Sequence, residues 1–240
     1  MKDGAFVLPG RIHEEELMDI EDVPEAELAR CLRDLARVNV ISAGYRPTLH
    51  WLDQATIGRD RVSIVDIGCG YGDMLRRVER WGKARGIETD LLGIDLNPKT
   101  IRIAQAATDP ASTIRWEAVN LFDIPEDHRP DIVISSLFAH HLGDEELVGF
   151  VRWLDRNCRV GWFINDLHRH WISAWGLTLI FAFWPVHRFV RNDGPVSVRR
   201  AFIREDLRRV AEAAGVPERT LTLRWWFPFR FGFGRITERG

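Results

Sequence analysis

Five short apolar runs alternate with amphipathic segments in the middle of this 240-residue chain. The runs are rich in β-branched residues and are bounded by glycine or turn residues, which is typical of buried strands. The segments between them have helical spacing, and one begins with Asn97 as a cap and Pro98 in its first turn. Such strict alternation predicts a parallel sheet covered by helices on both faces. The predicted strands lie within residues 62–68, 91–96, 113–120, 131–137 and 160–166.

The two ends of the chain follow other patterns. Residues 13–58 have acidic residues early and then apolar residues at helical spacing, so we expect helices there, interrupted at Gly44 and Pro47. Residues 197–216 predict one amphipathic helix that stops at a glycine. Two strand-like runs then flank Pro228 and predict an antiparallel hairpin at the sheet edge, where a proline is tolerated. No repeat or low-complexity linker divides the chain, so we expect one domain.

Composition excludes some classes of function. The formal net charge is -2, whereas a nucleic-acid-binding domain has a basic excess. The first residues turn polar at once, so we predict no signal peptide. The three cysteines, Cys31, Cys69 and Cys158, lack a CxxC spacing, which favours a reducing compartment and argues against structural zinc. We therefore expect a cytoplasmic protein that does not bind nucleic acid.

The first predicted strand ends in the glycine-rich stretch VDIGCGYGD. Gly68, Gly70 and Gly72 allow a tight turn and a close approach of a ligand to the backbone. The helix behind the turn would direct its free N–H groups and its positive dipole end at that ligand. Asp95, at the end of the second predicted strand, could accept hydrogen bonds from both hydroxyls of a ribose. The pattern therefore favours a nucleoside-type ligand at this edge of the sheet.

Two kinds of nucleoside cofactor compete for this turn. A dinucleotide site has the pattern GxGxxG, but Asp73 stands where the third glycine would fall. Asp66 precedes the turn, and its carboxylate would repel a pyrophosphate but suit an ammonium group. This favours an amino-acid nucleoside over NAD. An NAD-dependent enzyme and an ordinary glycine turn without a ligand remain the alternatives.

Four successive motifs, VDIGCGYGDML, GIDLNP, NLFDIP and DIVISSLFAHHL, resemble those of class I S-adenosylmethionine-dependent methyltransferases. The resemblance covers residues 60–165, in the order and spacing of that family. It implies an α/β fold with a doubly wound, seven-stranded, mostly parallel sheet, an antiparallel C-terminal hairpin and an N-terminal helical cap. It also implies S-adenosyl-L-methionine as the cofactor.

The cofactor positions of the family carry over to this sequence residue by residue. The glycine turn would line the methionine moiety, Asp95 would hold the ribose, and Leu96 would pack on the adenine. Where the family usually has an aspartate that accepts from the adenine amino group, this chain has Asn120. Its side-chain oxygen accepts without charge, so we expect modestly weaker cofactor binding. The resemblance assigns to the cofactor Asp66, Gly68, Cys69, Gly70, Asp95, Leu96, Asn120, Leu121 and Ser136.

The stretch SSLFAHHLGDEEL follows the fourth predicted strand, at the edge where such sheets bind ligands. AHHLGDE resembles a stretch of small-molecule O-methyltransferases, and the histidine that serves them as general base falls on His140. His141 is the second catalytic candidate, with a packed ring or a helix cap as its alternative. Asp166 would orient a histidine or bind substrate, or would instead cap the following helix. Asp166, His168 and His170 lack a familiar metal-site spacing, so we predict no metal.

An uncharged, aromatic-rich run occupies residues 171–186. It falls short of the about 20 apolar residues of a membrane-spanning helix, so we predict no transmembrane segment. Two interpretations stay open: core packing, or a lid that shapes the substrate pocket and could touch a bilayer. A loop of the N-terminal cap would close the other side. With the lid interpretation we assign to the substrate Tyr45, Arg46, His168, Trp171 and Trp175.

Together these features predict a methyltransferase that acts on a hydrophobic small molecule of phenolic, quinol or polyketide type. NDLHRH and GPVSVRRAF resemble methyltransferases of polyketide and phenolic-lipid pathways, and O-methylation of a phenolic hydroxyl is the favoured reaction. The alternatives are C-methylation of a quinol or polyketide ring and a non-catalytic, cofactor-binding regulatory role. We expect a monomer or homodimer. The single domain would comprise a helical cap (1–58), a cofactor-binding core (60–165), a substrate lid (167–200) and a C-terminal helix and hairpin (201–240).

Overall fold

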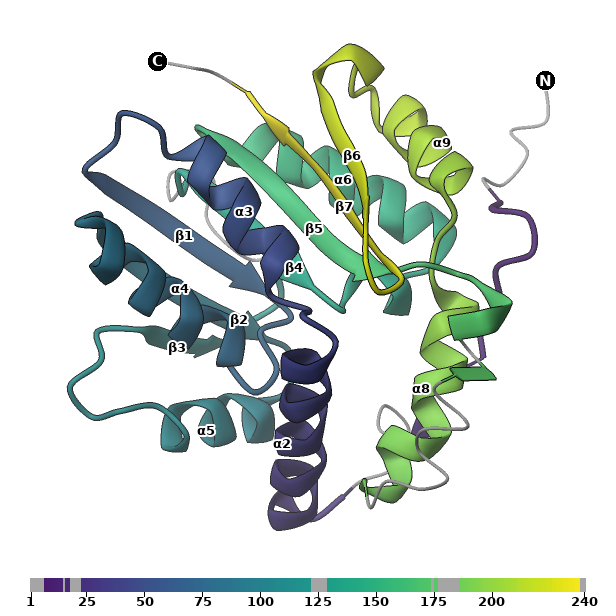
Figure 1. The fold of residues 1–240 in the computed structure, drawn as a ribbon, viewed down its shortest axis with the longest axis horizontal. Helices are drawn as coiled ribbons and strands as arrows, with labels where there is room; N and C mark the ends of the chain where they lie inside the picture. Colours follow the sequence, from purple (N-terminus) through teal and green to yellow (C-terminus); the bar gives the residue numbers. More distant parts are fainter. Residues whose placement is uncertain are drawn as a thin grey trace.

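The computed structural model describes residues 7–14, 16–17, 23–121, 129–173, 175–176 and 186–237. Its centre is a seven-stranded sheet in the order β3-β2-β1-β4-β5-β7-β6 (Figure 1). Strands β1 to β5 run parallel, β7 is antiparallel to β5, and β6 is antiparallel to β7. The predicted fold class is therefore confirmed. The strands are β1 (Arg61–Ile67), β2 (Glu88–Asp95), β3 (Arg115–Ala118), β4 (Ile132–Ser136), β5 (Gly161–Leu167), β6 (Leu221–Trp226) and β7 (Arg230–Ile236).

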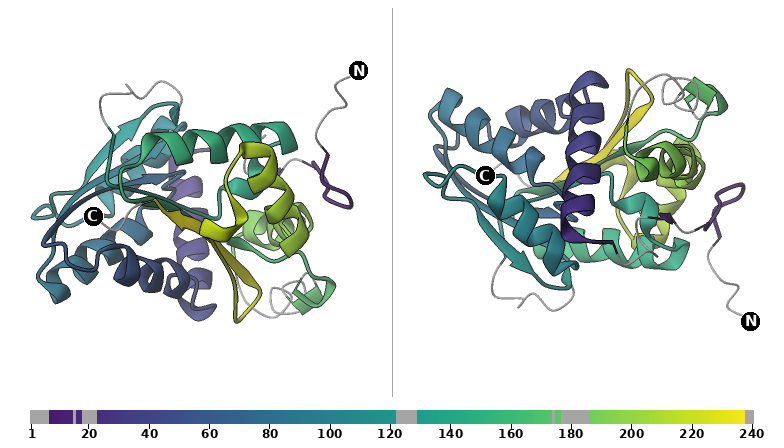
Figure 2. Two further views of the ribbon diagram at one scale, coloured as in Figure 1. Left: turned by 90° about the horizontal axis from the view of Figure 1, so that it is seen from above. Right: turned by 90° about the horizontal axis from the view of Figure 1, so that it is seen from below.

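Helices cover both faces of the sheet, because successive residues of a strand point to opposite sides. On one face, Ile64 of β1 shares a buried core with Trp51 and Leu75 of two helices. On the other face, Val65 shares a second core with Phe150. Figure 2 shows helices on both sides of the sheet. The covering helices are α3 (Arg46–Ala55) and α4 (Asp73–Arg85) on the first face, and α6 (Asp144–Asn157) and α9 (Arg204–Ala214) on the second.

One helix of the N-terminal cap stands away from the sheet. Helix α2 (Glu25–Ile41) lies beyond the carboxyl ends of the parallel strands, as Figure 1 shows. Its Leu28 and Leu32 pack with Ile103 of α5 (Pro98–Ala106). The break expected between the cap helices falls at residues 42–45. This position places an apolar helix face opposite the glycine turn.

The prediction of a single helix over residues 197–216 is wrong. The structure has two helices there, α8 (Arg188–Arg200) and α9, with a break between them. Phe202 lies in the break, its carbonyl accepts a hydrogen bond from Arg169 N at 2.8 Å, and its backbone forms a parallel bridge with His168. These tertiary hydrogen bonds need an extended backbone at Phe202, so they override the local helical pattern.

The C-terminal hairpin forms as predicted, with Pro228 in the turn between β6 and β7. Strand β7 is inserted beside β5, so β6 is the strand at the edge. The aromatic run at 171–186 is described only in part, because residues 174 and 177–185 lie outside the described residues. Within the described part of the chain, no helix is long and apolar enough to cross a membrane.

Candidate active site

A cavity of about 570 Å³ opens at the carboxyl ends of β1, β2 and β4. The strands bring their terminal turns together at this edge, as the doubly wound topology requires. Eight of the nine residues predicted to bind the cofactor line it, which places the glycine turn, the second-strand aspartate and the adenine-side residues around one space. They are Gly68, Cys69, Gly70, Asp95, Leu96, Asn120, Leu121 and Ser136.

The glycine turn has the backbone conformation that only glycine adopts without strain. Gly68 and Gly70 have φ angles of 67° and 51°, in the left-handed region. A Cβ atom on Gly68 would lie 2.6 Å from the ring of Phe138, whereas a Cβ on Gly70 would meet nothing within 4 Å. The absence of a side chain at Gly68 therefore lets Phe138 pack closely against the turn. At Gly70 it leaves open space in the cavity wall.

The carboxylate of Asp95 is held in place by two backbone groups. Its Oδ2 accepts a hydrogen bond from Gly70 N at 3.2 Å, and its Oδ1 accepts one from Asn97 N at 2.9 Å. Each carboxylate oxygen has a second lone pair for another donor. This geometry ties the acidic residue to the glycine turn and orients it at the cavity, as a ribose diol would require.

The ninth predicted residue, Asp66, lies behind the cavity wall. It is 2% exposed, and its Oδ1 has no hydrogen-bond partner among the residues that the structure describes. Burial, and then the charges of Asp73 and Asp95, raise the pKa of this carboxyl well above its usual range. A cationic ligand group near the turn would offset this cost. Three acidic residues around one turn suit the ammonium group of S-adenosylmethionine better than a pyrophosphate.

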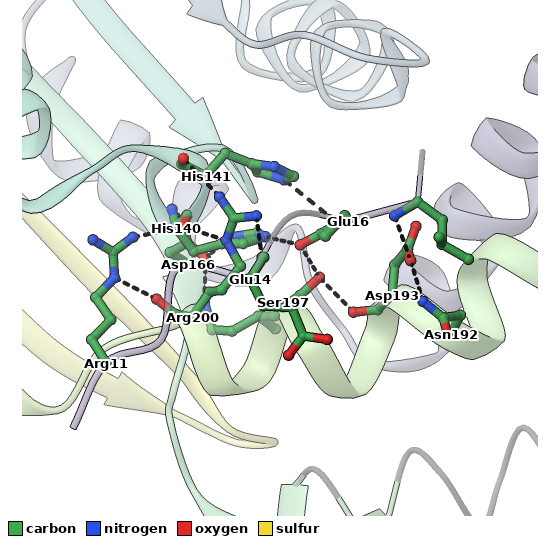
Figure 3. Close-up of polar contacts among 12 residues, drawn as sticks. Arg11, Glu14, Glu16, His140, His141, Asp166, Asn192, Asp193, Ser197 and Arg200 are labelled. Atoms are coloured by element: carbon green, nitrogen blue, oxygen red, sulfur yellow. Dashed lines mark hydrogen bonds and ion pairs between the residues drawn. The ribbon is translucent and has the colours of Figure 1, made fainter. Parts of the chain in front are cut away.

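The predicted catalytic residues form a connected cluster, shown in Figure 3. They lie on the 3-10 helix η2 (Ala139–His141) and at the end of β5. His140 is 2% exposed, and its Nδ1 lies 2.7 Å from Oδ1 of Asp166. Its backbone N–H donates to Oδ2 of the same carboxylate at 3.2 Å. His141 lines the cavity, whereas His140 and Asp166 lie behind its wall.

A glutamate that sequence reasoning missed completes the cluster. Oε1 of Glu16 lies 3.6 Å from Nε2 of His140, and its Oε2 lies 3.9 Å from Nε2 of His141. Burial lowers the pKa of His140, but Asp166 and Glu16 raise it by more, to about 9. Burial raises the pKa of Glu16, but the two histidines and Ser197 lower it by more, to about 2. Charges of opposite sign therefore compensate one another beside the cavity.

The N-terminal strap, which we define as residues 7–14 and 16–17, fixes Glu16 in this position. Its Arg11 donates to the carbonyl oxygen of His140 at 2.6 Å and to Oδ1 of Asp144 at 2.7 Å. Arg200 of α8 donates to the carbonyl oxygens of Glu14 and His141, each at 2.8 Å. The strap is thus held to η2, α6 and α8 at once. The acidic stretch around Glu16 looked like an ordinary helix start, and no local signal identified it.

The residues predicted to bind substrate lie elsewhere. Tyr45 is buried, and its hydroxyl hydrogen-bonds to Asp73 and to the carbonyl oxygen of Ala36. Arg46 is exposed at the start of α3, and His168 accepts a hydrogen bond from Trp225 Nε1 at 3.2 Å. The side chains of Trp171 and Trp175 are exposed. One apolar wall of the cavity comes from α2, through Leu28, Leu32, Leu35 and Ala36.

Comparison with known proteins agrees with this geometry. A protein-family model described as "Methyltransferase domain" matches residues 64–161. The putative methyltransferase Rv1506c of Mycobacterium tuberculosis is 47% identical over 45 residues, which are 19% of this chain and 25% of that protein. The match therefore spans about a quarter of the length of this curated relative.

Solved structures share the fold at low sequence identity. The plantazolicin methyltransferase BpumL, in complex with a pentazolic desmethylPZN analog and SAH, has a TM-score of 0.64 and 12% identity, over 90% of this chain and 97% of that chain. Human N-acetylserotonin methyltransferase with SAM has a TM-score of 0.62 and 12% identity, over 90% of this chain and 57% of that chain. Magnesium protoporphyrin IX methyltransferase from Synechocystis PCC 6803 with SAH has a TM-score of 0.54 and 14% identity, over 82% of this chain and 83% of that chain.

The domain match, the fold and the cavity together confirm the resemblance. Residues 64–161 match a methyltransferase domain, and the chain shares its fold with methyltransferases of small molecules. The neighbouring structures contain SAM or SAH, in agreement with the predicted cofactor.

Proposed function

We propose that this protein transfers a methyl group from S-adenosylmethionine to the hydroxyl of a hydrophobic small molecule, with a phenolic hydroxyl as the favoured acceptor. The observation that carries the proposal is one cavity whose lining includes the glycine turn, Asp95 and His141 together. The similar solved structures that are named for N-acetylserotonin and for magnesium protoporphyrin IX support a small molecule as the acceptor.

The described residues fit the cofactor. The Gly68–Gly70 turn would hold the methionine moiety, Asp95 the ribose hydroxyls, and Leu96 with Asn120 the adenine. When bound, S-adenosylmethionine supplies an electrophilic methyl group, whose bond electrons stay on sulfur as the acceptor oxygen takes the carbon. The chain must align the two reacting atoms, because methyl transfer is an in-line displacement.

The lining of the cavity is mostly apolar. Leu28, Leu32 and Leu35 of α2 line one wall, and Phe138 and Leu142 line the region around η2. An aromatic ring or alkyl chain gains about 25 cal/mol for each Å² of apolar surface that leaves water. The cavity composition therefore favours a hydrophobic acceptor, with its hydroxyl directed at the polar end near His141.

The sequence pattern assigned the general base to His140. In the structure His140 lies behind the cavity wall, and its ring is hydrogen-bonded to Asp166, whereas the adjacent His141 lines the cavity. In our proposal a ring nitrogen of His141 takes the proton of the acceptor hydroxyl as the oxygen–carbon bond forms. His140 and Asp166 are positioning residues, because they hold η2 and the cluster around it.

A screen with labelled cofactor tests the proposal. Phenols, quinols and alkylresorcinol lipids are incubated with the protein, and NMR of the product identifies the methylated atom. We expect a methyl ether; a ring-methylated product would establish C-methylation instead. His141→Ala should lower turnover at least about 100-fold, as loss of proton transfer does, with S-adenosylhomocysteine binding unchanged. Cofactor binding with no transfer to any acceptor would favour the non-catalytic alternative.

A further inference from the structure

Three side chains direct metal-ligating atoms at one point beside the cavity. The ligand atoms of Glu16, His140 and His141 all lie within 4.8 Å of one another. Figure 3 shows Glu16 reaching the histidines from the N-terminal strap. Glu16 and His140 are 3% and 2% exposed. Two imidazoles and one carboxylate are a ligand set that suits divalent zinc or iron, although the sequence pattern predicted no metal site.

The distances within the cluster suit a shared ion. The separations are 3.6 Å from Oε1 of Glu16 to Nε2 of His140 and 3.9 Å from its Oε2 to Nε2 of His141. Both are longer than the about 2.7–3.2 Å of an N–H···O hydrogen bond. Ligand atoms bound about 2.0–2.1 Å from one tetrahedral ion lie roughly 3.3 Å apart. A small inward movement of these side chains would therefore complete the coordination.

Outer groups already orient two of the ligands. Nδ1 of His140 lies 2.7 Å from Oδ1 of Asp166, so a neutral ring that donates from Nδ1 presents its Nε2 lone pair to the cluster. Oε1 of Glu16 accepts a hydrogen bond from the hydroxyl of Ser197 at 2.7 Å. Histidines that bind metals commonly donate their other ring N–H to a carboxylate in this way.

We propose that Glu16, His140 and His141 bind one divalent transition-metal ion, of the zinc class, in the cavity wall. The inference rests on the proposed function in one respect: His141 faces the acceptor end of the cavity. With three protein ligands, the ion keeps a coordination position open. An acceptor hydroxyl that enters it would have its pKa lowered, and its proton would pass to solvent water. His141 would then act as a ligand rather than as a base.

The alternative to a metal ion between Glu16 and the two histidines is a proton. In that case His140 carries the positive charge between Asp166 and Glu16, and the cluster is a buried ion-pair network. A direct metal titration separates the two states, because the network binds no ion stoichiometrically. The full chain is treated with chelator, desalted, and titrated with Zn²⁺ by calorimetry and with Co²⁺ by absorption spectroscopy, which reports the ligand field independently of turnover.

Matched variants locate the ion. We expect one ion for each chain, and at least a roughly 100-fold loss of Zn²⁺ affinity in Glu16→Gln and in His141→Ala. Asp166→Asn should weaken binding by about 10–100-fold, as loss of an outer-shell partner does. His187→Ala is the control: its Nε2 lies 3.3 Å from Oε1 of Glu27, a histidine–glutamate pair without a second histidine. The Zn²⁺ affinity of the His187→Ala variant should match that of the wild type.

The outcomes separate this inference from the proposed function. Each variant is first shown to be folded by its melting temperature and by S-adenosylhomocysteine binding. A folded wild-type protein that binds no Zn²⁺ or Co²⁺, or binds them equally well in Glu16→Gln and His141→Ala, overturns the metal site. If the chelated protein also methylates an acceptor at full rate, the proposed function stands without the ion. Stoichiometric binding that these two variants abolish supports the site even if no acceptor is methylated.

Discussion

The guanidinium of Arg11 donates a hydrogen bond to the carboxylate of Asp144 at 2.7 Å, although 133 residues separate them. The two side chains are 0% and 6% exposed. Through the same guanidinium, Arg11 also donates to the carbonyl oxygen of His140 at 2.6 Å. One buried cation therefore holds the N-terminal strap against the predicted catalytic helix and the start of α6.

Removal of this cation should destabilise the protein strongly. Arg11→Ala removes the guanidinium from the buried carboxylate of Asp144, which keeps the hydrogen bond from Leu8 N and the nearby ring of His13. Loss of one member of a buried pair costs about 3–5 kcal/mol. Urea unfolding measures the change. Arg37→Ala is the control, because the Arg37 side chain is 65% exposed in its pair with Asp34, and a solvent-exposed cation should contribute only about 0–1 kcal/mol. A loss at Arg11 as small as that at Arg37 would contradict the anchoring role of the strap.

The two glycines of the turn should respond differently to alanine. Both substitutions place a Cβ at positive φ, which costs about 1–2 kcal/mol. Gly68→Ala also forces the new Cβ against the ring of Phe138, and such overpacking adds about 1–3 kcal/mol. Gly70→Ala meets no neighbour but extends into the cavity, so it should weaken S-adenosylhomocysteine binding. Thermal unfolding and calorimetry of both variants test this order, and equal loss of stability would be evidence against it.

Asp95 should control cofactor affinity. Asp95→Asn removes the negative charge that would accept from the ribose hydroxyls, and hydrogen bonds to charged groups contribute about 1.5–3 kcal/mol. We expect S-adenosylhomocysteine to bind about 10–100-fold more weakly. Asp90→Asn on the same strand is the matched control, because Asp90 is an exposed partner of Arg115. Unchanged affinity in the first variant would show that this carboxylate does not hold the ribose.

Asn120 should limit the affinity on the adenine side. It lines the cavity, and Asn120→Asp would replace a neutral acceptor by an ionised one, which forms a hydrogen bond roughly twice as strong. We expect a gain of a few fold in S-adenosylhomocysteine affinity by calorimetry. Weaker binding in the variant would mean that the adenine amino group is not the partner of this side chain.

The cofactor half of the site was predictable because local chain chemistry determines it. Gly68 and Gly70 stand directly after an apolar strand, and Asp95 ends the next one. In a parallel sheet these three positions meet at one edge whatever the rest of the chain does. The order of the motifs alone therefore places these residues at one edge of the sheet, and all three line the cavity.

The cluster of Glu16, His140 and His141 depends on tertiary contacts that no local pattern encodes. Glu16 is one acidic residue among several, and only its contacts with Ser197 and the two histidines distinguish it. The roles of His140 and His141 also depend on which ring faces the cavity, and η2 decides this. Likewise, the hydrogen bonds of Phe202 end a helix that the sequence pattern would continue.

The strap also sets an order in time. The strap is synthesised before its partners, which include Asp144, Ser197 and Arg200. The chain therefore cannot build this site from its beginning to its end. The contacts of the strap can form only after Arg200 of α8 has been synthesised, whereas the five parallel strands are already complete at Leu167.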